Sequence, residues 1–266
     1  MVMVRSPAVA GMFYPADKAE LHRAVSGLLR AVPSGGAVPK ALIAPHAGYP
    51  YSGSTAARIY ARLLPAAEKI RKVVVIGPSH RVAFKGVALT QCQVYRTPLG
   101  EILLDAEMTA KAAAVPGVGI LEQAHIPEHS LEVHLPFLQE VLERFTLLPL
   151  VTGEATPDQV AKVLRAVWGG PETLIVVSTD LSHFHPYEDC VNLDAVTVKA
   201  IETLRFEDIG REQACGGVPV RGLLKLARED GMTVETVAVC NSGDTAGDKG
   251  RVVGYGAWAF TEKDAA

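Results

Sequence analysis

The sequence predicts a single α/β domain with a central mixed, largely parallel β-sheet that is flanked by helices. Along most of the 266 residues, short apolar runs alternate with segments of helical periodicity, which is the pattern of a sheet covered by helices. Several runs are apolar at every position, as in strands that are buried on both faces. Because neither an internal repeat nor a low-complexity segment divides the chain, we expect one domain over residues 1–266.

Four apolar runs are the expected strands of the sheet core. They are residues 41–44, 73–76, 145–151 and 174–177. Near the C-terminus, residues 234–239 and 252–260 alternate between apolar and polar side chains more regularly, which also favours strands. Residues 84–91 and 101–104 are expected to pair as a hairpin-like element at the side of the sheet.

Helices are expected between these strands, at residues 52–64, 131–145, 192–204 and 220–229, and after residue 156. The clearest helix start is Thr156-Pro157, because Thr is a preferred N-cap and Pro favours the first helical position. Helices between consecutive strands allow those strands to run parallel, so most of the sheet is predicted to be parallel.

The composition is that of a globular protein and excludes several classes. Apolar residues make up 48% of the chain and charged residues 21%, with a net charge of −3. Because Lys and Arg are scattered, we expect no nucleic-acid partner. No apolar run approaches the roughly 20 residues that span a membrane, and the first residues lack the pattern of a signal peptide. The four cysteines form no CxxC pair, which favours free thiols and a cytoplasmic location.

Three of the expected strands end in histidine. The first strand is followed by His46, the second by His80 and the third by His183, and a late strand leads into Asp244. In open α/β sheets, ligands bind beyond the carboxyl ends of the strands. Core strands usually end in turn residues, so three such ends among eight histidines are the most informative feature of the sequence.

Metal binding explains this pattern in physical terms. Neutral imidazole is the commonest metal ligand, and two histidines with one carboxylate suit iron(II) while leaving coordination positions open. Strand ends also hold side chains more rigidly than loops do. The alternative for any single histidine is a structural hydrogen bond at a strand end, but for His46 and His80 together we favour a metal-binding or catalytic role.

A second group of residues suggests acid–base chemistry. Asp180 and His183 are three residues apart, and if the chain turns after the strand, the carboxylate would orient the imidazole as a general base. The alternative is that Asp180 is an N-cap for that turn. His129 lies near an expected helix start and would point into the pocket, whereas His134 stands among apolar residues and is equally a core histidine. This segment has no HExxH motif, which excludes a zincin.

Taken together, six segments resemble one family. They are residues 5–15, 44–49, 77–80, 128–136, 178–183 and 241–244. This set spans essentially the whole chain and resembles the Memo family, whose bacterial and archaeal members are called AmmeMemoRadiSam system protein B. The resemblance implies a fold similar to class III extradiol ring-cleavage dioxygenases, which use non-haem iron(II). The family name also implies a pathway shared with a radical-SAM protein.

The resemblance implies a set of metal ligands. Carried over by position, His46 and His80 would bind the metal, and Asp244 falls near the third-ligand position. Animal Memo proteins have a pocket cysteine near this place, where the present chain has Thr245 beside Asp244. Cys240 lies a few residues upstream and is not equated with that cysteine. From the residues alone, Cys240 is a thiolate ligand, a nucleophile or a buried, inert thiol.

The resemblance also implies roles around the metal. His129 and His183 match the histidines that act as acid and base in those enzymes, and Asp180 matches the family aspartate beside His183. We therefore expect a metal-dependent, dioxygenase-like oxidoreductase that acts on a small molecule, with Fe(II) as the first choice of ion and copper or zinc as alternatives. Two other hypotheses remain: a binding or adaptor protein that catalyses nothing, and a protein that binds iron or copper in order to handle it.

Overall fold

A computed structural model describes residues 2–33, 35–210 and 212–263. Its main sheet runs in the order β10-β12-β2-β9-β3-β8-β4-β7, and β11 pairs with the other edge of β12. The strands are β2 (Ala41–Ala44), β3 (Lys72–Pro78), β4 (Val87–Leu89), β7 (Val118–Ile120), β8 (Thr146–Thr152), β9 (Thr173–Ser178), β10 (His183–His185), β11 (Thr233–Asn241) and β12 (Val252–Thr261).

The four central strands are parallel, as the sequence predicts. β2 pairs with β9, β9 with β3, and β3 with β8, all in parallel register. β12 runs antiparallel to both β2 and β11, so the sheet is mixed. Parallel strands end at the same edge of a sheet, which places the segments after β2, β3 and β9 side by side.

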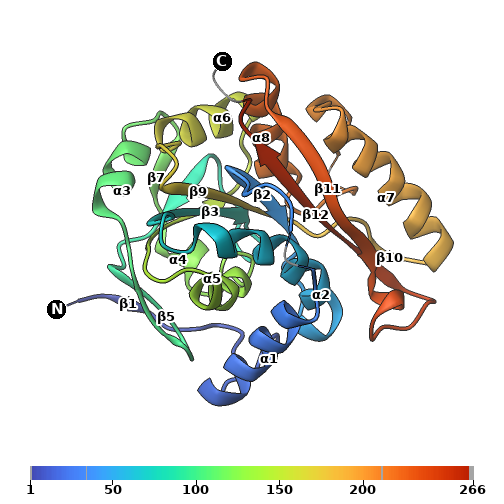
Figure 1. The fold of residues 1–266 in the computed structure, drawn as a ribbon. Helices are drawn as coiled ribbons and strands as arrows, with labels where there is room; N and C mark the ends of the chain where they lie inside the picture. The colour runs from blue at the N-terminus through green and yellow to red at the C-terminus, as the bar shows by residue number, and fades with distance from the viewer. Residues whose placement is uncertain (1, 34, 211, 264–266) are drawn as a thin grey trace.

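Helices cover both faces of this sheet (Figure 1). Alternate residues of β3 enter two separate hydrophobic clusters, Val73 and Val75 on one face and Val74 and Ile76 on the other. The first cluster includes residues of α1 (Lys18–Arg30), α2 (Tyr49–Tyr60) and α5 (Leu135–Val141). The second includes residues of α3 (Ala106–Ala113), α6 (Pro157–Ala166), α7 (Tyr187–Glu202) and α8 (Gly217–Glu229). The continuous apolar runs of the sequence are therefore strands buried on both faces.

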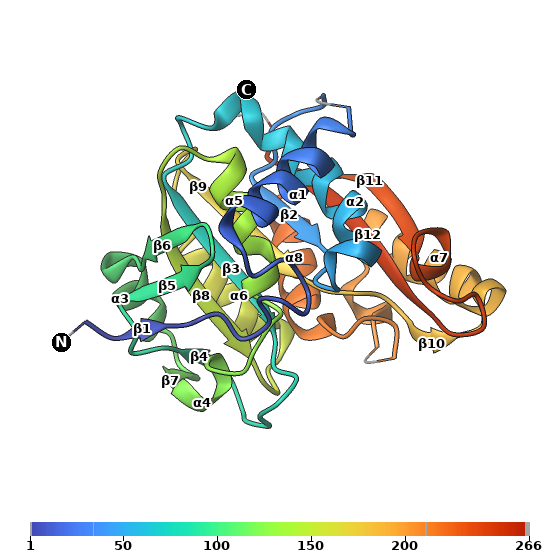
Figure 2. The same cartoon turned by 90° about the horizontal axis from the view of Figure 1, so that it is seen from below.

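A small second sheet lies beside the main one (Figure 2). It contains β1 (Val4–Arg5), β5 (Val94–Thr97) and β6 (Gly100–Leu103). The expected pairing of residues 84–91 with 101–104 is wrong: β4 joins the main sheet next to β8, and the hairpin forms between β5 and β6. The reason is burial, because all three residues of β4 are buried and a strand covered on both faces belongs inside the sheet.

The helices agree with the sequence in place and differ in extent. Thr156 caps α6 in a capping box with Gln159, as its sequence predicts. The helix expected at 131–145 is instead a 3₁₀ turn, η2 (Glu132–His134), followed by α5, which ends at Val141. Pro136 stands in the first turn of α5, where its missing N–H costs nothing.

Short elements complete the chain. They are α4 (Glu122–His125), η1 (Ala61–Ala66), η3 (Phe206–Asp208) and η4 (Ser242–Asp244). None of the helices within the described ranges is long and apolar enough to cross a bilayer.

Candidate metal centre

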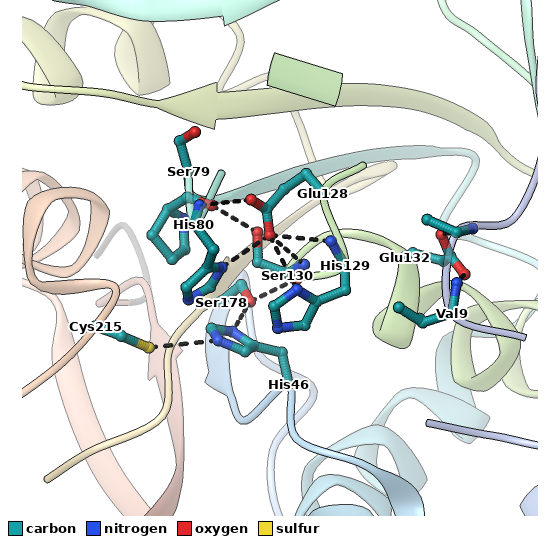
Figure 3. A network of polar contacts seen from close by, with 12 residues as sticks. Val9, His46, Ser79, His80, Glu128, His129, Ser130, Glu132, Ser178 and Cys215 are labelled. Carbon is teal, nitrogen blue, oxygen red and sulfur yellow. Dashed lines mark hydrogen bonds and ion pairs between the residues drawn. The ribbon is translucent and has the colours of Figure 1, made fainter. Parts of the chain in front are cut away.

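Three histidines meet at the carboxyl edge of the parallel strands (Figure 3). His46 follows β2, His80 follows β3, and His129 precedes η2. The ring centroids of His46 and His80 are 5.1 Å apart, those of His46 and His129 are 5.4 Å apart, and those of His80 and His129 are 4.6 Å apart. The structure therefore brings the rings of three predicted site residues into contact.

The His46 side chain is oriented by a chain of two serines. Its Nδ1 lies 2.6 Å from Ser178 Oγ, and the Ser178 hydroxyl donates to the carbonyl oxygen of Ser130 at 2.6 Å. Since the serine proton is used for the carbonyl, the Ser178 oxygen must accept, and Nδ1 of His46 carries the hydrogen. The lone pair is therefore on Nε2, which is the state of a histidine ready to bind a metal.

The His80 side chain is oriented by a carboxylate. Its Nδ1 lies 2.8 Å from Oε1 of Glu128, whose side chain is only 1% exposed. Glu128 also accepts the backbone N–H groups of His80, His129 and Ser130. Burial raises the pKa of Glu128, but the contact with His80 and the backbone N–H groups outweigh it and lower the pKa to about 2. The ionised carboxylate fixes the proton on Nδ1 of His80 and leaves Nε2 free.

Cys215 lies beside His46 and His80 and forms a possible metal-binding group with them. The sequence did not indicate this role for Cys215. Its Sγ lies 3.3 Å from Nε2 of His46 and accepts the backbone N–H of Asp180 at 3.3 Å. One ligand atom from each of His46, His80 and Cys215 falls within 4.8 Å of the other two. A Cβ at Gly216 would collide with the carbonyl oxygen of Ser178, so the glycine allows the Cys215 loop to approach β9.

These three side chains fit a transition-metal ion. Tetrahedral bonds of about 2.0–2.3 Å to nitrogen and sulfur place two donors about 3.5 Å apart, close to the 3.3 Å between His46 and Cys215. Burial and the nearby Asp180 carboxylate raise the pKa of the Cys215 thiol to about 12, so metal binding would have to displace its proton. Burial also lowers the pKa of His46 far below its usual range, which keeps it neutral.

A second combination of donors, His80, Glu128 and His129, is also close enough to hold an ion. It fits less well, because the Glu128 oxygens already accept hydrogen bonds from His80 and from backbone N–H groups. A metal there would have to displace those donors. Glu128 is better described as the residue that positions His80.

Asp244 lies away from the histidines, in contrast to its expected role as third ligand. Its carboxylate accepts the Tyr187 hydroxyl at 2.6 Å and the backbone N–H of Asn241 at 2.9 Å. β11, which leads into Asp244, is separated from β2 by β12. Among the described residues, Cys215 and not Asp244 completes the group with His46 and His80. Cys215 therefore takes the third place in the group that the sequence analysis gave to Asp244.

Asp180 contacts His46 rather than His183. Its carboxylate accepts the backbone N–H of His46 at 2.8 Å, and its Oδ2 lies 3.9 Å from His46 Nε2. Burial raises the pKa of Asp180 to about 7, against the opposing effect of these N–H groups. The chain does turn after β9, but the carboxylate turns toward β2 and holds the loop that carries His46.

His183 keeps the features of a general base without that aspartate. Its Nδ1 donates to the carbonyl oxygen of Leu181 at 2.8 Å, which leaves the lone pair on Nε2. Burial lowers its pKa, and the neighbouring His80 lowers it further. A lowered pKa favours the neutral imidazole of His183, whose Nε2 can accept a proton.

His129 lies at the edge of the cluster, between His80 and the N-terminal segment. Its ring packs against Phe13 at 4.8 Å between centroids and stacks on His80. Burial lowers the pKa of His129 to about 4, although Glu128 acts in the opposite direction. A neutral His129 beside a ligand suits the predicted acid–base role.

The other residues singled out in the sequence are structural. His134 is a core histidine, with Nδ1 2.9 Å from the Tyr60 hydroxyl. The Cys240 thiol lies 3.0 Å from the Thr55 hydroxyl, and burial raises its pKa, as for an inert thiol.

One feature of the sequence around Cys215 could have marked it as a candidate site residue. It stands directly before the two glycines that open α8. No strand leads into it, however, so a search limited to strand ends passes over it.

Comparison with known proteins supports one family for the whole chain. The family described as Memo-like protein matches residues 5–259. A protein of Aquifex aeolicus is 38% identical over 95% of this chain and 97% of its own length, and one of Aeropyrum pernix is 35% identical over 95% and 98%. Both are described as MEMO1 family proteins. An uncharacterized protein of Escherichia coli K12 shares the fold, with a TM-score of 0.51 and 13% identity over 81% of this chain and 98% of its own.

Proposed function

The chain belongs to the Memo-like protein family, and we propose that it is a metal-dependent oxidoreductase whose ion is held by His46, His80 and Cys215. One observation carries the proposal. Both histidines have Nδ1 committed to a buried partner, and their metal-binding group also contains a thiol that touches one free Nε2. Such fixed tautomers are typical of metal ligands.

Iron(II) bound there would supply redox chemistry and open coordination positions for dioxygen and a chelating substrate. His183 would accept a proton from the substrate through Nε2, since its Nδ1 is held by Leu181. His129, neutral and stacked on His80, would stabilise negative charge that develops beside the ion. Asp180 and Glu128 would hold His46 and His80 in position through the hydrogen bonds described above.

The thiol of Cys215 favours a second candidate function. Thiolate is a softer ligand than carboxylate and suits copper(I) or zinc as well as iron. A two-histidine, one-cysteine site would therefore also serve a protein that binds iron or copper in order to sequester it. The two functions share the ligands and differ in turnover, which an experiment separates.

The test is metal binding and oxygen uptake in protein purified without oxygen. We expect one equivalent of Fe(II) at micromolar concentration in the wild type, and loss of that binding in His46→Ala. His22→Ala is the matched control, because His22 is exposed and paired with Glu140 far from the site. Oxygen uptake that requires a catechol and is lost in His183→Ala, while iron is retained, supports the oxidoreductase.

Each failure has a distinct meaning. If the wild type binds no divalent or monovalent transition metal at micromolar levels, both functions are wrong. If it binds copper(I) more tightly than iron(II), and the metal-loaded protein consumes no oxygen with catechols, metal handling replaces the oxidoreductase.

A further inference from the structure

A groove adjoins the candidate metal centre on the side of Cys215. It has a volume of about 760 Å³, and both Cys215 and Ser79, the residue before His80, line it. Of the three candidate ligands, Cys215 is the one that lines the groove, so the groove adjoins the metal-binding group at that residue. A substrate that reaches the metal with one end has room in this groove for its remaining atoms.

The groove contains an unusual cation. Arg221 lines it, and the Nε atom of Arg221 is buried without a hydrogen-bond partner among the described residues. A buried N–H of a guanidinium that no acceptor satisfies is costly. A bound acceptor next to the guanidinium is one physical explanation for such a group.

The position of Arg221 on α8 directs it toward the metal centre. Gly217 and Arg221 are four residues apart on α8 and both line the groove, so they share one helix face. Helical side chains lean toward the N-terminus of their helix, which here is the end next to Cys215. The first turn of α8 has no acidic residue and no side-chain cap, so its dipole adds to the positive potential.

The opposite wall adds no net charge. Lys85 and Glu154 lie there in paired backbone segments and contribute one charge of each sign. The remaining lining includes apolar side chains, namely Val82, Phe84, Ile209 and Val218. The groove thus has a mixed polar and apolar lining, with one unmatched positive charge on α8.

We propose that this groove binds the body of an organic acid, whose carboxylate pairs with Arg221 while its other end reaches the metal. The inference rests on the proposed function for the role of the metal, and it adds the class of substrate. Arg suits this task because its planar guanidinium binds a carboxylate through two parallel hydrogen bonds. An aromatic or aliphatic acid would place its apolar part against Val82, Phe84, Ile209 and Val218.

The test measures binding of benzoate to the metal-free protein, so that it does not depend on the metal. We expect saturable benzoate binding by calorimetry, and at least about ten-fold weaker binding in Arg221→Gln, since a charge-assisted hydrogen bond is lost. Arg228→Gln is the matched control: it removes the same charge from the same helix at an exposed residue paired with Glu207. It should bind benzoate as the wild type does.

Two further probes define the chemistry. Benzamide, which is neutral and has nearly the same shape, should bind at least ten-fold more weakly than benzoate. Inorganic phosphate should bind more weakly than benzoate, because it leaves the apolar walls empty. If phosphate binds more tightly than benzoate, the ligand is a phosphate and the proposed class is wrong.

Equal benzoate affinity in wild type and Arg221→Gln, or no benzoate binding at all, would overturn the inference. Neither result touches the proposed function, because iron binding is measured separately on the same proteins. Conversely, loss of metal binding with intact benzoate binding would refute the metal centre and leave the anion site.

Discussion

Glu128 and Glu132 are four residues apart and both are buried, but they serve different parts of the molecule. Glu132 pairs with Arg5, 127 positions away in the sequence, and both side chains are almost fully buried. Glu128 has no cationic Arg or Lys partner among the described residues and is held by His80 and three backbone N–H groups. Glu132 fastens the N-terminal segment to the fold, and Glu128 orients His80, a candidate metal ligand.

The Glu132 contacts secure the N-terminal segment next to the site. Besides Arg5, its carboxylate accepts the backbone N–H groups of Ala8 and Val9 and the hydroxyl of Tyr14. Phe13, between them, packs on His129. Figure 3 shows Val9 and Glu132 together, set apart from the histidine cluster. The buried Glu132 carboxylate, paired with a full positive charge, holds the N-terminal segment in place. The Glu128 carboxylate, held by N–H groups and an imidazole, instead sets the proton position and orientation of that imidazole.

The largest effect on stability is expected at the buried ion pair of Arg5 and Glu132. Glu132→Gln leaves Arg5 buried without a countercharge and should lower the free energy of unfolding by about 3–5 kcal/mol, measured by urea denaturation. The double variant Arg5→Met, Glu132→Leu should recover part of that loss, because no unpaired charge remains. A loss below about 1 kcal/mol in Glu132→Gln would mean that the pair does not anchor the fold.

The next largest effect is expected on metal affinity, at the contact between Glu128 and His80. Glu128→Gln should weaken metal binding about 10–100-fold, because the amide no longer fixes the proton on Nδ1 of His80. Its unfolding free energy should fall by less than that of Glu132→Gln. Unchanged metal affinity in Glu128→Gln would show that the orientation of His80 does not depend on this carboxylate, and the comparison between the two glutamates would break.

The pH dependence of stability should reflect the histidines of the same segment. Burial lowers the pKa of His134 to about 3 and that of His129 to about 4, so the folded protein keeps both neutral while the unfolded chain binds protons below pH 6.5. Stability of the metal-free protein is therefore present above pH 6.5 and lost as the pH falls, by up to about 1.4 kcal/mol per pH unit for each histidine. Asp180, with its pKa raised to about 7, binds a proton when folded and offsets one histidine.

His134→Gln isolates one part of this dependence. Between pH 6.5 and 5, the slope of unfolding free energy against pH should become smaller in the variant by about one proton. His22→Gln, a change at an exposed histidine, should leave the slope unchanged. An equal slope in wild type and His134→Gln would mean that His134 is protonated in the folded state.

The smallest effect on stability is expected at Thr156, and it serves as a control for general destabilisation. Thr156→Ala removes the side-chain cap of α6, and Thr156 has no hydrogen bond to either glutamate among the described residues. Loss of an N-cap costs about 1 kcal/mol, and metal affinity should not change. If this variant also weakens metal binding, the affinity loss in Glu128→Gln would have to be attributed to general destabilisation.

The sequence predicts those parts of the site that strands place directly. His46, His80 and Asp180 follow β2, β3 and β9, whose apolar runs are plain and whose parallel pairing brings their ends together. Asp244, the predicted third ligand, does not lie in the site, because β12 separates β11 from β2. This strand order cannot be read from the sequence. Cys215 follows a loop rather than a strand, so no periodicity marks it.

The contacts that the sequence does not predict join residues far apart in the chain. Nothing local relates Arg5 to Glu132, and only the folded chain shows that residues 5–14 lie against the segment that carries His129. In the sequence, Glu128 and Glu132 have the four-residue spacing of neighbours on a helix face. In the structure, Glu128 lies outside any helix and Glu132 begins η2, so the two carboxylates take different partners.

The identity of the third ligand is the most direct test of this account. Cobalt(II) bound by a thiolate has an intense sulfur-to-metal charge-transfer absorption in the near ultraviolet, which nitrogen and oxygen ligands do not give. We predict this band in the cobalt-loaded wild type and in Asp244→Asn, and its absence in Cys215→Ser. A cobalt-loaded wild type without the band, or a Cys215→Ser variant that keeps it, would contradict the assignment of His46, His80 and Cys215 as the metal ligands.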